Sequence, residues 1–118
     1  MALGTVADYI AAARVLLQDT DSTAYRYLDT ELVNALNMGI LEARRLRPDL
    51  FFSYLGSTLP SYSTASLGAS VAIDAQYRVA FVYYMCGQAQ LRDEENTQDT
   101  RSAVFLNKFV AQLQNLQA

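Results

Sequence analysis

The chain has 118 residues, of which 52% are hydrophobic and 18% are charged, and its formal net charge is -3. This length fits one domain, and the acidic balance disfavours a free DNA-binding domain, which normally carries a basic face. The single cysteine, Cys86, excludes an intramolecular disulfide, so we expect folding in a reducing cytoplasm. We find neither a signal-peptide pattern at Met1 to Thr5 nor the ~20 consecutive apolar residues that span a bilayer, and we therefore expect no membrane partner.

The first predicted helix covers residues 5–18. Thr5 and Asp8 can form a capping box at its start. Apolar residues then follow at helical spacing on one face: Val6, Ile10, Ala13 and Leu17. Residues 19–23 end the helix, and they differ from a calcium-binding loop because Ala24 stands where such a loop needs glycine. We therefore predict an ordinary polar turn.

The second predicted helix begins at about Asp29, expected as its N-cap, and ends before Pro48. Its apolar stripe consists of Val33, Leu36, Ile40 and Ala43. Three arginines crowd its last turn: Arg44, Arg45 and Arg47. Cations suit the negative end of the helix dipole, and Glu42 can pair with Arg45 one turn away. We favour this structural role for the arginines over a contact with phosphates or an acidic partner.

The segment from Leu50 to Ile73 contains no charged residue. Loops longer than about 12–15 residues are uncommon in compact domains and are usually functional or disordered. Disordered segments are usually charged and poor in aromatics, and this segment is neither. We predict that residues 51–73 form a long loop or short hairpin that orders against another surface. Its candidate interface residues are Tyr54, Leu55, Leu59, Tyr62 and Leu67.

The third predicted helix starts after a cap at Asp74, and the fourth starts after a cap at Asn96. The third is apolar around most of its circumference, which is typical of a central helix, and it contains Cys86 as a small buried hydrophobe. The fourth carries its apolar stripe on Phe105 or Leu106, Phe109, Leu113 and Leu116. The sequence thus predicts an all-α, four-helix bundle-like domain over residues 1–118, with the loop between helices two and three.

Patterns for catalysis and metal binding are scarce. The chain has no histidine and one cysteine, which removes Ser-His-Asp and Cys-His arrangements and structural zinc sites. Its five glycines are scattered and form no phosphate-binding loop. We therefore expect no enzyme, no metal and no cofactor. The alternative of an enzyme that uses carboxylates would be marked by a cleft with a perturbed Asp or Glu.

Several stretches resemble the small head-to-tail adaptor proteins of tailed phages. They are residues 5–17, the run from Tyr25-Arg26-Tyr27 to Arg47-Pro48-Asp49-Leu50-Phe51, and the run from Gln88 to Asn96 that leads into the last helix. The resemblance implies a helical bundle that forms a ring, usually dodecameric, under the portal protein. Such a ring extends the DNA channel and meets the next tail component, a stopper or nozzle protein.

The resemblance also implies a place in the virion at the head-tail junction, after assembly in the host cytoplasm. Double-stranded DNA would pass through without specific binding, which suits a chain of net charge -3. By the same analogy the last helix and tail, from about Phe105 to Ala118, would dock on the portal. The candidate interface residues of this segment are Phe109, Leu113 and Leu116. Two alternatives stay open: a non-catalytic helical interaction module, and a DNA-packaging or regulatory protein, which should show a clustered basic face and steep salt dependence.

Overall fold

Helices make up most of the computed structural model, which describes residues 3–49, 51, 59–73, 75–92 and 99–114. Among these residues, the α-helices are α1 (Val6–Leu17), α2 (Asp29–Leu46), α3 (Arg78–Arg92) and α4 (Asp99–Leu113), and the short 3-10 helices are η2 (Thr64–Ser66) and η3 (Ala75–Tyr77). Extended pairing in the described ranges is limited to an isolated antiparallel bridge between Thr5 and Ser70. The predicted all-α, bundle-like class is confirmed.

The start of α1 follows the predicted capping box. Thr5 Oγ1 accepts a hydrogen bond from the Asp8 N–H at 3.3 Å, and the Asp8 carboxylate accepts from the Thr5 N–H at 3.0 Å. The helix ends at Leu17, and its C-cap Gln18 has a φ of 58°, in the left-handed region that closes many helices. The predicted apolar stripe is buried throughout: Val6, Ile10, Ala13 and Leu17.

The start of α2 differs from its prediction by one residue and by its chemistry. Asp29 is the first helical residue, and Leu28 is the N-cap without a side-chain capping bond. The Asp29 carboxylate instead accepts a hydrogen bond from the guanidinium of Arg14 at 2.6 Å. The helix ends at Leu46, two residues before Pro48, as expected. The predicted stripe of Val33, Leu36, Ile40 and Ala43 is buried.

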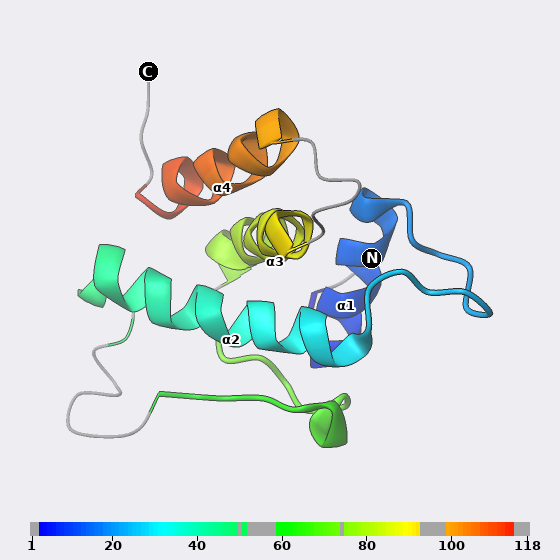
Figure 1. The fold of residues 1–118 in the computed structure, drawn as a ribbon. Helices are drawn as coiled ribbons and strands as arrows, with labels where there is room; N and C mark the ends of the chain where they lie inside the picture. The colour runs from blue at the N-terminus through cyan, green and yellow to red at the C-terminus, as the bar shows by residue number, and fades with distance from the viewer. Residues whose placement is uncertain (1–2, 50, 52–58, 74, 93–98, 115–118) are drawn as a thin grey trace.

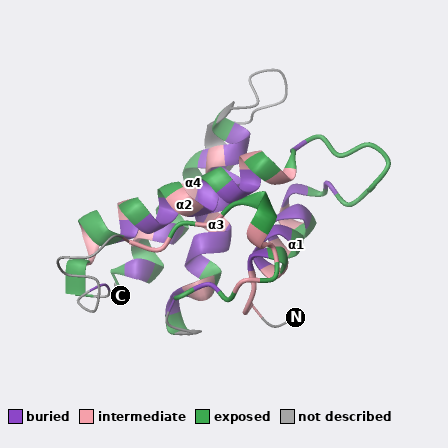
Figure 2. Cartoon of the chain, turned by 90° about the horizontal axis from the view of Figure 1, so that it is seen from below, coloured by how far each residue is buried: buried purple, intermediate pink, exposed green. Residues whose placement is uncertain are grey.

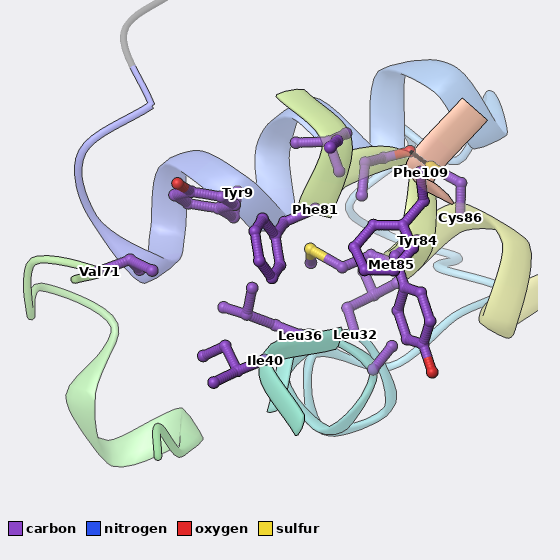
Figure 3. Packing of buried hydrophobic residues seen from close by; sticks show 14 of the residues in the cluster. Tyr9, Leu32, Leu36, Ile40, Val71, Phe81, Tyr84, Met85, Cys86 and Phe109 are labelled. Atoms are coloured by element: carbon purple, nitrogen blue, oxygen red, sulfur yellow. Dashed lines mark hydrogen bonds between the residues drawn. The ribbon is translucent and has the colours of Figure 1, made fainter. Parts of the chain in front are cut away.

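Helix α3 is the centre of the fold, as its all-round apolar character predicted. It lies between α2 and α4, with α1 beside it (Figure 1). Phe81 meets Phe109 of α4 edge-on with ring centroids 5.6 Å apart, and Tyr84 packs on the same ring at 4.7 Å. Met85 and Cys86 are fully buried among these side chains (Figure 3). Gly87 lets α4 approach closely, because a Cβ there would lie 2.8 Å from Leu106.

Three residues of the helix predictions lie outside the described residues. These are the expected caps Asp74 and Asn96 and the stripe residue Leu116. The described part of α4 buries Phe105, Phe109 and Leu113, so its predicted face is confirmed up to Leu113. Figure 2 shows this inward face as buried, in contrast to the exposed connection between α1 and α2.

The described part of the predicted loop, residues 59–73, forms what we call the strap. It runs below α2 in Figure 1, returns toward the start of α1 and then leads into η3. Val71 and Ile73 at its end are buried in the core. No hairpin occurs within residues 59–73; the strap pairs with the start of α1 instead.

Candidate functional site

Phe109 and Leu113 of α4, which we predicted as interface residues, are 1% and 0% exposed. They belong to the core of the single chain, where Phe109 packs on Phe81, so the prediction of a surface made by these two residues is wrong. The apolar stripe of the helix that the family analogy assigned to the portal is the one that α4 buries against α3. Leu116 lies outside the described residues. Phe109 and Leu113 are therefore not available for the expected docking on a portal.

The predicted interface residues of the strap are partly buried against the chain itself. Leu59, Tyr62 and Leu67 pack on the edge of the core, each with intermediate exposure. Tyr54 and Leu55 lie outside the described residues. The uncharged segment thus orders against its own helices over the part that the structure describes.

Backbone hydrogen bonds tie the strap to the start of α1. The N–H groups of Val6 and Ala7 donate to the carbonyls of Ala69 and Leu67 at 3.1 and 2.9 Å. The Val71 N–H donates to the Gly4 carbonyl at 2.9 Å. The first N–H groups of a helix have no partner within the helix, so the strap acts as a second cap beside the capping box.

A side chain of α2 holds the middle of the strap. The Asn37 amide donates to the Tyr62 carbonyl at 2.8 Å and accepts from the Tyr62 N–H at 2.9 Å. The Tyr62 hydroxyl in turn accepts from the Ala72 N–H at 2.9 Å. These bonds use the polar atoms of Tyr62 within the chain, so that residue is a fold determinant as well as a partly exposed aromatic.

The connection between α1 and α2, residues 18–28, is organised by a buried arginine. Arg14 is 5% exposed. Its guanidinium donates hydrogen bonds to the Asp19 carboxylate at 2.9 Å, to the Tyr27 carbonyl at 2.9 Å and to the Asp29 carboxylate at 2.6 Å. The Tyr25 ring lies over it, with its centroid 3.5 Å from Cζ. Nothing in the sequence analysis identified this cluster.

Asp19 completes the cluster from the other side. Its carboxylate accepts from the backbone N–H groups of Arg26 at 2.8 Å and Tyr27 at 2.9 Å. A buried carboxylate needs such donors and an opposite charge. The cluster therefore shapes a polar connection, and it carries one positive and two negative charges when Asp29 is counted.

An apolar groove lies between α1 and α3. Its volume is about 290 Å³, and its walls include Leu3, Ala12, Val15, Leu16, Val79 and Tyr83. Val15 is 57% exposed and Val79 is 48% exposed. Val15 also borders a neighbouring hollow of about 410 Å³ that reaches Tyr25 and Asp29. We call the first of these the α1–α3 groove.

A second apolar feature lies on α2. Met38 and Leu41 are 45% and 60% exposed and stand three residues apart, which places them on one helix face. Gly39 lies about 100° from Met38 and about 160° from Leu41 around the helix. It faces α3, where Tyr84 is 3.0 Å from the position of an added Cβ. Met38 and Leu41 therefore point away from α3, and we call this pair the α2 ridge.

Two of the three arginines near the end of α2, Arg45 and Arg47, make contacts within the chain, which agrees with the structural role that we favoured. Arg47 pairs with the Asp49 carboxylate at 2.8 Å and donates to the Leu113 carbonyl of α4 at 2.8 Å. This pairing raises the pKa of Arg47 and lowers that of Asp49. Arg45 pairs with Glu42 as predicted, with Nε to Oε1 at 2.8 Å. Arg44 is exposed.

The perturbed ionisable groups have structural causes. Burial raises the pKa of Tyr9 to about 12 and raises that of Tyr84. Backbone hydrogen bonds from Thr5 and Gly4 lower the pKa of Asp8, and a hydrogen bond from Thr23 lowers that of Asp21. These shifts keep phenols protonated and carboxylates ionised near neutral pH. Among the described residues, no group of three His, Cys, Asp or Glu side chains is placed to hold a metal ion.

Comparison of the chain with models of known families, with curated proteins and with solved structures finds no match in any of the three. Among the described residues, no helix combines the length and apolarity that crossing a membrane requires.

Proposed function

We propose that this chain is a non-enzymatic structural subunit, and specifically a head-to-tail adaptor that forms a ring between the portal and the tail of a phage. The observation that supports it best is the presence of two apolar surface features on different sides of one small bundle. The α1–α3 groove and the α2 ridge expose Val15, Val79, Met38 and Leu41 by 45% or more. Apolar side chains that group on one surface, rather than standing singly, typically mark contacts with other proteins.

The proposal assigns the chain a position in which neighbours contact it on several sides. A ring subunit has one neighbour on each flank and further partners above and below, here the portal and a stopper or nozzle protein. The net charge of -3 suits a channel wall that passes double-stranded DNA without holding it. The resemblance of residues 5–17, 25–51 and 88–96 supplies the specific assignment to the phage connector.

Quantitative mass spectrometry of particles purified from the phage that carries this sequence tests the proposal. The copy number of this chain is measured against that of the portal protein, with the major capsid protein as an internal reference. A ratio near one to one is the expected result for a ring that matches the portal. Absence from the particle would contradict the adaptor role, and DNA binding as a function of salt would then test the regulatory alternative.

A further inference from the structure

The α2 ridge and the α1–α3 groove match each other in chemistry. The ridge presents Met38 and Leu41, and the groove presents Val15 and Val79 between flanking apolar walls. Neither surface places a charge at its centre. Burying Leu41 in such a groove removes apolar area from water on both partners, which favours association.

The charges beside the two surfaces are also complementary. Along α2, the ridge is followed by exposed Arg44 and Arg45, and Glu42 neutralises one of these two charges. Beside the groove, the hollow that shares Val15 is also lined by Asp29, whose side chain is 45% exposed, and by its ion-pair partner Arg14. Counting Arg14, Asp19 and Asp29 alone, the cluster there has an excess of one negative charge. An apolar ridge with a basic end thus corresponds to an apolar groove with an acidic end.

We propose that the ridge of one copy of this chain packs into the α1–α3 groove of a second copy. The occupant of the groove is therefore the chain itself, and Arg44 of one copy approaches Asp29 of the other. This inference deepens the proposed function, and only its extension to a closed ring rests on that function. The contact between two copies can be tested in isolation.

The placement of the two surfaces determines the kind of assembly. The ridge points away from α3, whereas the groove is partly built by α3, so the two features are not one self-complementary patch. Contacts between different patches on identical chains are heterologous and repeat from copy to copy. Such contacts close into a ring when the rotation between neighbours is a whole fraction of a turn.

Complementation between two defective chains tests this geometry. Val15→Asp places a charge in the groove, and Leu41→Asp places one on the ridge. Each variant alone should be monomeric by light scattering and native mass spectrometry, with association weakened at least about tenfold relative to wild type. An equimolar mixture should form a one-to-one dimer, because each chain keeps the surface that the other lacks. Ala111→Asp, exposed on α4, adds the same charge elsewhere and should leave association unchanged.

Helical circular dichroism and urea unfolding of each variant establish that the chains are folded. Arg44→Glu should weaken association at low salt and recover part of it at about 0.5 M NaCl, where like-charge repulsion is screened. A wild-type chain that stays monomeric up to millimolar concentration, or a mixture that stays monomeric, would overturn the inference. Particle counting is independent of this result: a one-to-one ratio with the portal and no complementation would leave the adaptor role standing with a different contact between copies.

Discussion

The connections before and after α2 are stabilised by different kinds of interaction. Residues 18–28 before it are polar and mostly exposed, and their shape depends on side chains that meet at buried Arg14. The strap after it is uncharged, and its shape depends on backbone hydrogen bonds to α1 together with the side chain of Asn37. The first connection concentrates its contacts on one charged group, while the strap distributes them along its length.

This difference determines how each connection should fail. A buried ionic cluster is sensitive to the loss of a single member, because the remaining charge keeps its desolvation penalty. A segment held by several separate hydrogen bonds loses one modest contribution at a time, each about 0.5–1.5 kcal/mol. The connection that looks like an ordinary polar turn in the sequence is therefore the more vulnerable of the two.

Removing the guanidinium of Arg14 should have the largest effect. Arg14→Met leaves Asp19 buried without its countercharge, and we expect a loss of about 3 kcal/mol in the free energy of unfolding, measured by urea titration. This loss is at the lower end of the range that is typical for breaking a buried ion pair, because the N–H groups of Arg26 and Tyr27 still donate to Asp19. Arg14→Met combined with Asp19→Asn should recover part of it, since no unpaired buried charge remains.

The matched control is Arg45→Met, which breaks an ion pair on the surface. Arg45 is 69% exposed at its side chain, and solvent screens such a pair, so the loss of stability should be much smaller than for Arg14→Met. Equal losses for Arg14→Met and Arg45→Met would show that the buried cluster does not determine the stability of the first connection.

Releasing the strap should have a smaller effect. Asn37→Ala removes both hydrogen bonds to the backbone of Tyr62, and we expect a loss of about 1–2 kcal/mol. Amide hydrogen exchange at Val6 and Ala7 should become faster, because these N–H groups donate to strap carbonyls. Asn34→Ala, an exposed position on the same helix, is the control and should change neither quantity. Unchanged exchange in Asn37→Ala would mean that the strap stays on α1 without its anchor.

The helices could be predicted from the sequence because their information is local. Thr5 and Asp8 specify the start of α1, and Pro48 limits α2. Arg14 was missed because its partners are set by the path of the chain, from Asp19 close by to Asp29 fifteen residues away. The sequence does contain a signal for a buried arginine. Arg14 lies one turn after Ile10 on the apolar side of the helix, where a charged side chain needs partners.

The candidate interface was harder to predict, for a physical reason. Helical periodicity identifies an apolar face but does not say whether that face meets its own chain or another. The family analogy assigned Phe109 and Leu113 to a partner, yet they pack inside the bundle. The exposed residues Leu41 and Val15 were not singled out, because only the packing of α2 and α1 reveals which of their apolar side chains remain outside the core.

The smallest expected effect concerns Asp8, where the two kinds of cap meet at the start of α1. Hydrogen bonds from Thr5 and Gly4 hold the pKa of Asp8 below its ordinary value of 3.8. A lowered pKa means that this carboxylate stabilises the fold above about pH 4 and that the contribution is lost as the pH falls through the folded-state value. Asp8→Asn should thus be less stable than wild type at pH 7, and the difference should shrink toward pH 3.

Urea unfolding of both chains at the two pH values measures this convergence, and subtracting one chain from the other cancels the titration of Asp21 and Asp49. The strap bonds to Val6 and Ala7 join backbone groups that do not titrate. At pH 3 the amides of Val6 and Ala7 should therefore still exchange more slowly than the same amides in an unfolded chain. The Thr5 amide, which donates to Asp8, should lose its protection. Equal loss at all three amides would mean that the capping box and the strap open as one unit rather than as two independent caps.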